Sequence, residues 1–260
     1  MLISLLISLG IAMVLLQVAV FSTTIYLHRA ATHRALVLHP AVAWVFRAAL
    51  WITTGINVRQ WVAVHRKHHA FTDEEGDPHS PHLEGFWSVQ LGNVFHYVRE
   101  ARDQQVLDKY ARDIKDDWWE RYLFGYGSAG PVFGTTALCV VCASAGLGVG
   151  WALLAAGLHG FLYVFVLSPS INGLCHYLGY RNFKNTATNI RLIALITGGE
   201  GLHNNHHGFP RSPRFSVRRK WSEIDPAWPV IWCLTKLGLA TPYRTIEEHQ
   251  AHPDARPQET

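Results

Sequence analysis

Two long stretches of the chain are apolar and uncharged, and they predict membrane-spanning helices. Residues 1–27 contain no charged side chain, and neither do residues 122–180, a run of 59 residues. About 20 apolar residues suffice for one helical crossing of a bilayer, so the second run has room for two crossings and a turn. The pattern predicts spans at residues 3–27, 131–149 and 151–171, with a turn at 146–150.

A third apolar stretch, residues 41–57, has Arg47 near its middle. Because a charge at bilayer depth is costly, we interpret this stretch as an interfacial or re-entrant helix and not as a span. No segment shows sustained period-two alternation, so we expect an all-α integral membrane protein with a cytoplasmic helical cap. One domain is predicted over residues 1–242, followed by a mobile polar tail over 243–260.

Composition agrees with a membrane location and orients the chain. Hydrophobic residues make up 49% of the chain and charged residues 16%, which is a low charged fraction for a soluble protein. All 23 Lys and Arg residues lie within residues 28–121 and 181–260. The positive-inside rule therefore predicts that these two segments face the cytoplasm. No feature of the sequence predicts a nucleic-acid partner.

Histidine is concentrated in four short clusters within the cytoplasmic segments and at their edges. They are His28-Arg-Ala-Ala-Thr-His33, His65-Arg-Lys-His68-His69, Asn172-Gly-Leu-Cys-His176 and His203-Asn-Asn-His206-His207. In each HxxHH triplet the later imidazoles follow the first by three and four residues, offsets that share one helix face. A single histidine is more often a core or surface residue, but only ligation or proton chemistry needs imidazole at this density.

The number of imidazoles exceeds what one metal ion needs. A zinc site takes three or four protein ligands, so nine histidines predict two ions, each held by four or five imidazoles. The predicted ligands are His28, His33, His65, His68, His69, His176, His203, His206 and His207. His28 and His33 point about 140° apart on an ideal α-helix, so they need not bind the same ion. A shared site also needs every cluster on one side of the membrane, which supports the interfacial interpretation of residues 41–57.

Other ligand and cofactor patterns are weak. Imidazole ligation suits iron, copper, zinc or nickel, and the affinity order alone does not choose between them. The cysteines form no metal or disulfide pattern, since Cys139 and Cys142 lie in the middle of a predicted span. The glycines at 146–150 follow no strand and do not form a nucleotide loop. A metal pair at a membrane surface is typical of an enzyme with a lipid-like substrate.

The clusters at residues 28–33, 65–69 and 203–207 resemble the first, second and third histidine boxes of the membrane fatty acid desaturases. Surrounding motifs are similar to the acyl-CoA Δ9 (stearoyl-CoA type) branch: Trp61 before His65, Asp77-Pro-His-Ser-Pro81 with Gly85-Phe-Trp87, Asn172-x-x-x-His176, and Gly199-Glu-Gly-Leu-His203. The resemblance covers roughly residues 20–240. It implies an oxidoreductase with two iron ions, which uses O2 and two electrons to insert a cis double bond, at Δ9, into a saturated C16 or C18 acyl chain.

Further expectations come from the resemblance alone. The substrate would be a fatty acyl-CoA or an acyl-lipid, and electrons would come from an external ferredoxin- or flavin-type reductase. A bacterial form in the inner membrane is implied, because His39-Pro40 lacks the diglycine context of a fused cytochrome b5 domain. One span precedes the first box, where animal relatives have two. We therefore expect either that the first of those two spans is dispensable here or that the start is truncated.

Polar residues near the histidines have candidate supporting roles. Asn172 lies one helical turn before His176, so its amide could hold a metal-bound water, with a helix-cap or backbone role as the alternative. Asp73, Asp77 and Glu200 are candidates for partners that accept hydrogen bonds from imidazole N–H groups.

Substrate-binding candidates lie close to the second box. Trp61 is a candidate for the wall of an acyl tunnel, with interfacial anchoring as the alternative. Arg59, Arg66, Lys67 and the cationic run 211–220 could attract a CoA or phospholipid headgroup, or they could simply form the positive cytoplasmic face.

Two other functions compete with desaturation. A hydroxylase or ketolase of a lipid or carotenoid would use the same scaffold, and an oxygen atom added to the product would identify it. A non-enzymatic membrane metal carrier or sensor would place ligands along its spans, whereas these clusters lie at the cytoplasmic ends. His249 and His252 fall outside every cluster and are not expected as ligands.

Overall fold

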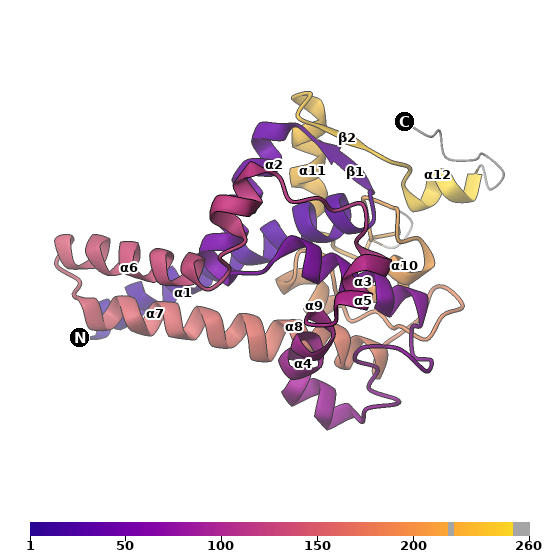
Figure 1. Cartoon of the computed structure of the whole chain (residues 1–260), viewed down its shortest axis with the longest axis horizontal. Coiled ribbons are helices and arrows are strands. Elements are labelled where there is room, and N and C mark those ends of the chain that lie inside the picture. Colours follow the sequence, from indigo (N-terminus) through magenta and orange to yellow (C-terminus); the bar gives the residue numbers. More distant parts are fainter. Residues whose placement is uncertain (218–220, 252–260) are drawn as a thin grey trace.

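Helices make up almost all of the regular structure of the chain. The computed structural model describes residues 1–217 and 221–251, and Figure 1 shows its elements in chain order. The α-helices are α1 (Leu2–Phe21), α2 (Pro40–Thr54), α3 (Val58–Ala70), α4 (Phe86–Ala101), α5 (Gln104–Tyr110), α6 (Ala129–Ser144), α7 (Val149–Phe161), α8 (Ser168–Asn172), α9 (Arg191–Ile196), α10 (His203–Gly208), α11 (Ala227–Lys236) and α12 (Ile246–Ala251). The π-helices are η1 (Ser22–Thr32), η2 (Glu120–Phe124) and η3 (Leu162–Leu167), the 3-10 helix is η4 (Leu174–His176), and the strands are β1 (Leu36–Leu38) and β2 (Ala240–Pro242).

Two continuous helical segments are long and apolar enough to cross a membrane. Leu2–Thr32, with 31 residues, joins α1 to η1, and Val149–His176, with 28 residues, runs from α7 to η4. They contain the expected spans at 3–27 and 151–171. The expected span at 131–149 corresponds to α6, which has 16 residues and is therefore shorter than both. Such a helix rises about 24 Å, less than a hydrocarbon core of about 30 Å.

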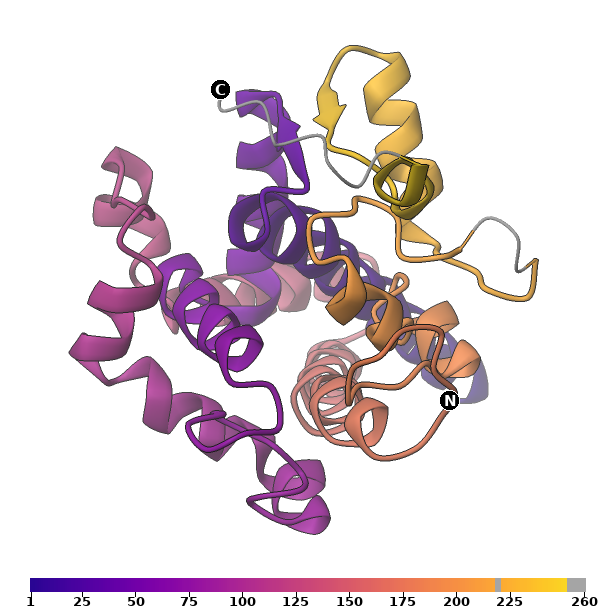
Figure 2. The same ribbon diagram turned by 90° about the vertical axis from the view of Figure 1, so that its right-hand side faces the viewer.

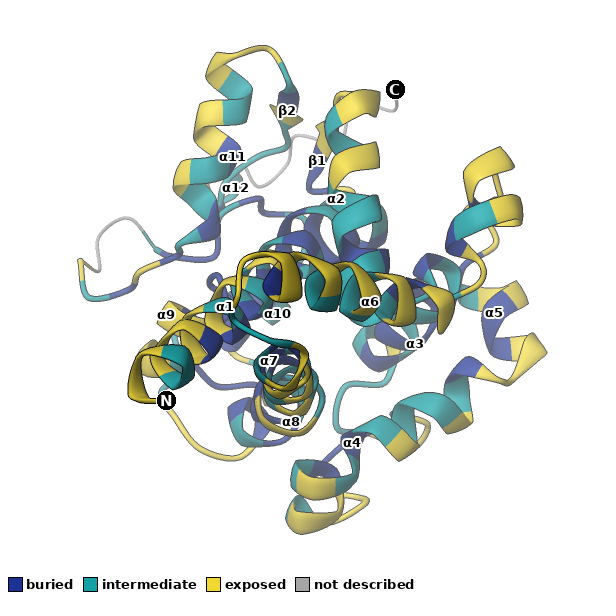
Figure 3. Cartoon of the chain, turned by 90° about the vertical axis from the view of Figure 1, so that its left-hand side faces the viewer, coloured by how far each residue is buried: buried dark blue, intermediate teal, exposed yellow. Residues whose placement is uncertain are grey.

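Helices α1, α6 and α7 lie together at one end of the molecule. Helix α7 packs against both α1 and α6, and the N-terminus and the α6–α7 connection point to the same side (Figure 1). Much of the outward surface of these helices is exposed (Figure 3), and it includes the apolar side chains of Phe133, Val140, Leu153 and Phe161. An exposed apolar surface of this kind needs lipid or a partner to cover it.

The expected interfacial segment 41–57 contains a sharp bend. Helix α2 ends at Gly55, which has a left-handed φ of 66°, and α3 begins three residues later at an angle of 89° to α2. By length and composition the pair α2–α3 fits either a broken span or a re-entrant loop. Within α2, the side chain of Arg47 pairs with Asp117 at 2.5 Å and with Glu120 at 2.6 Å, so its charge is neutralised by protein carboxylates.

Small residues let α6 approach the C-terminal turn of α2. The glycines of Gly130-Pro-Val-Phe-Gly134 are four residues apart and lie on one face of α6. A Cβ atom on Gly134 would stand 2.8 Å from the carbonyl oxygen of Ile52, and one on Gly130 would collide with the carbonyl oxygen of Trp51. This is the close backbone packing that small-xxx-small motifs give to membrane helices.

Replacing Gly130 by alanine should therefore destabilise the contact between α6 and α2. The added methyl group meets backbone atoms that cannot rotate away, so we expect a loss of about 1–3 kcal/mol, measured as a lower unfolding temperature of the detergent-purified protein. Gly157→Ala is the matched control, because the space around Gly157 on α7 is open. An equal shift in both variants would contradict the packing argument.

The C-terminal segment returns to the N-terminal part of the chain. Strands β1 and β2 pair antiparallel, with Leu38 opposite Ala240, so the expectation of an all-α protein is wrong for these two short segments. Residues 243–251, within the expected polar tail, include helix α12, whose Ile246 is fully buried. The rest of that tail, 252–260, and the cationic residues 218–220 lie outside the described residues.

The elements that carry the histidine clusters converge at the end of the molecule away from the α6–α7 hairpin. Helices α3 and α10 lie there in Figure 1, and Figure 2 shows this end from the front. The second box lies on α3 and the third on α10, whereas the first lies on η1 and at its C-terminal end, and the cluster at residues 172–176 ends at η4. Segments far apart in the sequence therefore contribute to one site.

Candidate metal centre

All nine predicted ligand histidines come together in two groups. The first group contains His28, His33, His65, His69 and His206, and the second contains His68, His176, His203 and His207. Within each group the candidate ligand atoms lie within 4.8 Å of one another. The rings of His69 and His207 stack at 4.2 Å between centroids, so the two groups are in contact.

The winding of η1 explains why His28 and His33 lie in the same group. On an α-helix a five-residue offset separates side chains by about 140°, but η1 is a π-helix, in which hydrogen bonds join residues five apart. The amide of His33 donates to the carbonyl of His28 at 3.1 Å, and their rings meet edge to face at 4.9 Å. The expectation that the two side chains could serve different ions assumed an α-helix. The segment is a π-helix instead, and this winding places both rings in the first group.

Each HxxHH triplet contributes to both groups. On α3, His65 and His69 belong to the first group and His68 to the second. On α10, His206 belongs to the first group, and His203 and His207 belong to the second. The three rings still share a face, as the spacing predicts, but that face spans the boundary between the groups. The two helices therefore hold the groups together.

Distances between ring nitrogens have the values expected around metal ions. Nε2 of His206 lies 2.9 Å from Nε2 of His69 and 3.1 Å from Nε2 of His28. In the second group, Nε2 of His207 lies 3.3 Å from Nε2 of His68. An ion with metal–nitrogen bonds of about 2.1 Å holds adjacent nitrogens about 3.0 Å apart at right angles and about 3.4 Å apart at the tetrahedral angle. The donor set therefore fits two ions ligated by imidazole.

Three carboxylates orient the imidazoles. The pairs are His28 with Glu200 at 2.7 Å, His68 with Asp77 at 3.0 Å, and His176 with Asp73 at 2.9 Å. Each involves Nδ1, so the ring donates its N–H to the carboxylate and turns the lone pair of Nε2 towards the group. The structure thus brings all three predicted acidic partners, Asp73, Asp77 and Glu200, next to predicted ligands.

Burial keeps the three histidines of α10 neutral. It lowers the pKa of His203, His206 and His207 well below the ordinary value, and the neighbouring imidazoles lower it further. A neutral ring has a free lone pair, so these side chains are ready to bind a cation at neutral pH. Burial alone would raise the pKa of Asp77, but the hydrogen bond from His68 and the nearby imidazoles lower it to about 2. That carboxylate stays charged.

The two asparagines inside the third box anchor α10. Asn204 and Asn205 are fully buried. The amide of Asn204 donates to the carbonyls of Phe183 and Ala187, each at 3.0 Å, and the amide of Asn205 donates to Glu223 at 2.9 Å. Replacing a satisfied buried amide leaves its partners unpaired, so these side chains hold His203–His207 in place. Asn204 and Asn205 are part of the HxxHH motif in the sequence, but their role depends on contacts with residues outside the motif.

A buried ion pair joins the first box to the C-terminal region. Arg29 is fully buried and donates to Asp225 at 2.9 Å, to the carbonyl of Pro213 at 2.8 Å and to that of Gly198 at 3.1 Å. Its guanidinium also lies 3.9 Å above the ring of Phe215. The α9–α10 and α10–α11 connections are therefore both fastened to the residue that follows His28.

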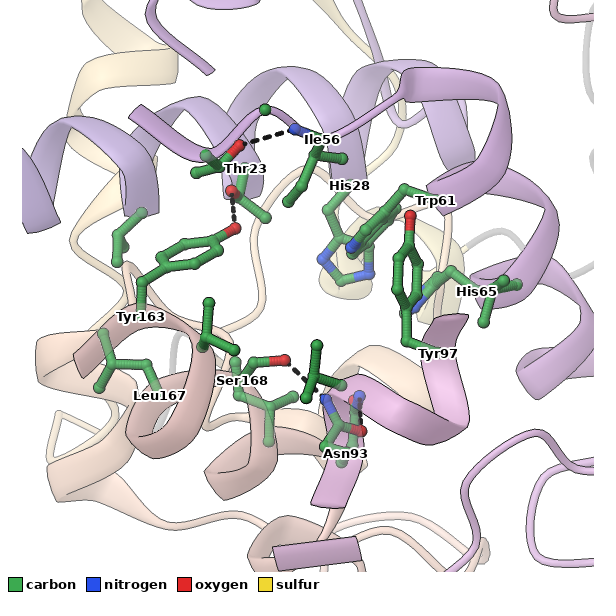
Figure 4. Close-up of a pocket in the computed structure, with 18 of the residues that line it drawn as sticks. Thr23, His28, Ile56, Trp61, His65, Asn93, Tyr97, Tyr163, Leu167 and Ser168 are labelled. Atoms are coloured by element: carbon green, nitrogen blue, oxygen red, sulfur yellow. Dashed lines mark hydrogen bonds between the residues drawn. The ribbon is translucent and has the colours of Figure 1, made fainter. Parts of the chain in front are cut away.

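A cavity of about 430 Å³ borders the first histidine group (Figure 4). His28 and His65 form part of its wall, and Trp61 stacks on His65 with 4.7 Å between the ring centroids. Across the cavity lie Tyr163, hydrogen-bonded to Thr23 at 2.6 Å, and a wall of aliphatic side chains. The volume is in the range of roughly 300–1,000 Å³ of small-molecule sites, and the mostly apolar wall suits a hydrocarbon chain.

Asn172 belongs to a chain of hydrogen bonds in the cavity wall. Its amide donates to Asn93 at 3.0 Å, and the amide of Asn93 donates to Ser168 at 2.8 Å. The carbonyl oxygen of Asn172 is the side-chain atom that can accept a hydrogen bond from a water. Asn93 and Ser168 carry no signal in the sequence that would single them out.

His79 is the site histidine that spacing does not predict. Its ring is buried and stacks on His68 with 4.7 Å between centroids, and its candidate ligand atom lies within 4.8 Å of those of His68 and Asp77. It also lines the cavity. His79 is part of the Asp77–Pro81 motif, which is the only feature of the sequence that points to it.

The predicted headgroup cations lie away from the cavity wall. Arg59 pairs with Asp108 at 2.8 Å, Arg66 pairs with Asp113 at 2.5 Å, and Lys67 pairs with Glu100 at 2.5 Å; none of the three is among the cavity-lining residues that the structure describes. Each charge is therefore satisfied by a protein carboxylate, as expected for an ordinary solvated face. His249 packs against Phe209 on the surface and joins neither histidine group.

Comparison with known proteins agrees with these features. Residues 5–232 match the fatty acid desaturase family. The Delta-9 desaturase-like 3 protein of Arabidopsis thaliana is 35% identical over 228 residues, 85% of this chain and 71% of the relative. The Acyl-CoA C20 Delta5-desaturase of Anemone leveillei is 33% identical over 88% of this chain and 71% of its own length. The sn-1 stearoyl-lipid 9-desaturase of a Synechocystis species is 30% identical over 84% and 65%, respectively.

Proposed function

We propose, since this chain belongs to the fatty acid desaturase family, that it inserts a cis double bond at Δ9 into a saturated C16 or C18 acyl chain. The observation that carries this proposal is the position of two groups of histidines, of five and four members, beside an apolar cavity. Iron is the proposed metal, with two ions per chain. The substrate is an acyl-CoA or an acyl-lipid, since relatives named for each are among the matches.

Two bound iron ions would supply the oxidising chemistry, by which –CH2–CH2–, O2, two electrons and two protons become –CH=CH– and two waters. The chain itself contributes position and electrostatics. Glu200, Asp77 and Asp73 hold three imidazoles with Nε2 turned inward, and the buried carboxylates offset the positive charge of the metal pair. The cavity holds the acyl chain beside His28 and His65 and excludes water from it.

The product distinguishes desaturation from hydroxylation on the same scaffold. We expect that bacterial cells expressing the protein accumulate cis-Δ9 monounsaturated C16 or C18 acyl chains, because the mostly apolar cavity can hold a methylene chain beside the first histidine group. The measurement is gas chromatography of fatty acid methyl esters with a derivative that locates the double bond. Products that retain every hydrogen and gain oxygen would replace this proposal by a hydroxylase or ketolase.

We further propose that α6 joins the two longer helices as a third, shorter span, with the histidine groups on the cytoplasmic side. The support is that α1, α6 and α7 lie together, and that all Lys and Arg residues fall outside 1–27 and 122–180. The α2–α3 bend then returns to the side on which it began. Electrons would reach the site from an external reductase in the cytoplasm.

Cysteine labelling tests this topology. In a background with exposed Cys233 replaced by serine, we expect Ala145→Cys to react with a membrane-impermeant maleimide in intact cells, because the α6–α7 connection faces outward. Glu75→Cys should react only after the cells are opened. Both positions are exposed, so burial cannot explain a difference. Labelling of Glu75→Cys from outside would refute the arrangement.

A further inference from the structure

A cationic basin opens on the surface next to the first histidine group. Its positive side chains are Arg34, Arg66, Lys109, Arg112 and Arg211, and its wall includes His33, one of the predicted ligands. No other residue of the first group lines it among those the structure describes. The basin therefore connects solvent to a single ligand imidazole.

Four separate segments build the basin. Arg34 follows η1, Arg66 lies on α3, Lys109 and Arg112 come from α5 and the turn after it, and Arg211 follows α10. Helices α3, α5 and α10 lie at the end of the molecule opposite the α6–α7 hairpin (Figure 1). The basin thus belongs to the end of the protein opposite the apolar helices α6 and α7.

The basin has an excess of positive charge. Its one acidic side chain, Asp113, accepts from Arg34 at 2.6 Å and from Arg66 at 2.5 Å. Among the described residues, no carboxylate pairs with Lys109, Arg112 or Arg211; Lys109 and Arg211 lie over the rings of Tyr110 and Tyr243 instead. Three cations are therefore left to attract an anionic partner.

Arg34 is held in an unusual backbone conformation. Its φ of 52° is left-handed, which is rare for a residue other than glycine and costs on the order of 1 kcal/mol or more. The side chain is 65% exposed, so burial of the side chain does not compensate for this strain. The strained position lies immediately after His33, where it keeps a cation at the rim of the basin.

We propose that the cationic basin is the docking surface for the electron donor, a small one-electron carrier protein with an acidic face. This inference rests on the proposed function, because desaturation consumes two electrons and two docking events of a one-electron carrier would deliver them. The oxidised carrier leaves after each transfer. Complementary charge raises the encounter rate of such partners, and His33 places the first histidine group at the contact.

An anionic lipid headgroup is another ligand with suitable charge. The apolar helices α1, α6 and α7, whose exposed side chains lipid would cover, lie at the opposite end of the molecule, so a headgroup at the basin would be far from the bilayer around them. The position of the basin favours a soluble partner.

Binding of a reduced plant-type [2Fe–2S] ferredoxin, an acidic carrier, tests the proposal. We expect the purified protein to bind ferredoxin with a Kd that rises steeply with ionic strength, and Lys109→Glu to raise this Kd at low salt at least about fivefold. Arg112→Glu should do the same and guards against a folding defect in either variant. The same variants should raise the KM for ferredoxin in monoene formation while kcat stays within about twofold.

Lys184→Glu is the matched control, since Lys184 is an exposed lysine on the loop before α9, outside the basin. Its Kd should stay within about twofold of the wild type. Equal effects of Lys109→Glu and Lys184→Glu, no salt-sensitive ferredoxin binding, or displacement of ferredoxin by short-chain phosphatidylglycerol would each overturn the proposal.

The proposed function has its own readout, which is monoene formation driven by dithionite and methyl viologen in the wild-type protein. Failure of that reaction, with salt-sensitive ferredoxin binding through Lys109 intact, would remove desaturation and leave the docking surface standing.

Discussion

Replacement of His206 by alanine should abolish product formation. Nε2 of His206 lies within 3.1 Å of Nε2 of both His28 and His69, so this ring is central to the first group. Removing it leaves four imidazoles in the first group and one ligand position unfilled, and we expect activity below about 1% of the wild type. His68→Ala should have the same effect on the second group, where the ring also contacts Asp77.

Metal content separates loss of a ligand from loss of the protein. We expect about two iron ions per purified wild-type chain and one or fewer in His206→Ala, with both proteins found in the membrane fraction, because the apolar helices are untouched. His249→Ala is the control, as its ring packs on the surface against Phe209. An inactive His249→Ala together with an active His206→Ala would invalidate the assignment of the site.

The second large effect is expected on stability. Asp225→Ala removes the anionic partner of Arg29, whose guanidinium is fully buried and cannot reach water. Breaking such a pair from one side costs about 3–5 kcal/mol, and for a chain of this size this lowers the unfolding temperature by roughly 6–20 °C. Tryptophan fluorescence of the detergent-purified protein during heating measures the shift.

Asp108→Ala is the comparison for this prediction. Asp108 pairs with Arg59 at 2.8 Å, but its side chain is 60% exposed. A surface pair of this kind contributes about 0–1 kcal/mol, so the unfolding temperature should change by a few degrees at most. If the two variants unfold at the same temperature, the Arg29–Asp225 pair does not fasten the loops around the first box.

Features that depend on local sequence could be predicted. The apolar runs at 3–27 and 151–171 are long enough to identify their helices, because span length and composition are properties of a single segment. The shorter extent of α6 could not be read in this way, since its run of apolar residues continues past Ser144 into the turn at Ala145–Gly148. Strands β1 and β2 have three residues each and find their partners at the far end of the chain.

In the candidate site, too, features set by local sequence could be predicted and features set by tertiary contacts could not. Spacing selected nine histidines, and the structure brings all nine into two groups. How the groups divide could not be predicted, because it depends on where α3 faces α10. His79 and Asn93 lie outside every ligand spacing. The Asp77–Pro81 motif is the one sequence feature that points to His79, and only tertiary contacts identify Asn93. The sequence shows that Arg59, Arg66 and Lys67 are charged. It does not show that each pairs with a carboxylate in the folded protein.

The wide winding of η1 also affects how the chain could vary in length. An offset of five residues on a π-helix and an offset of four on an α-helix both place one side chain nearly above another. A homologue with one residue fewer between the positions of His28 and His33 could therefore keep both rings in the same group by winding that segment as an α-helix. The HxxHH triplets have no such freedom, because their helices already have α-helical winding. Single-residue deletions should be tolerated at Ala30 or Ala31 far better than between His65 and His68.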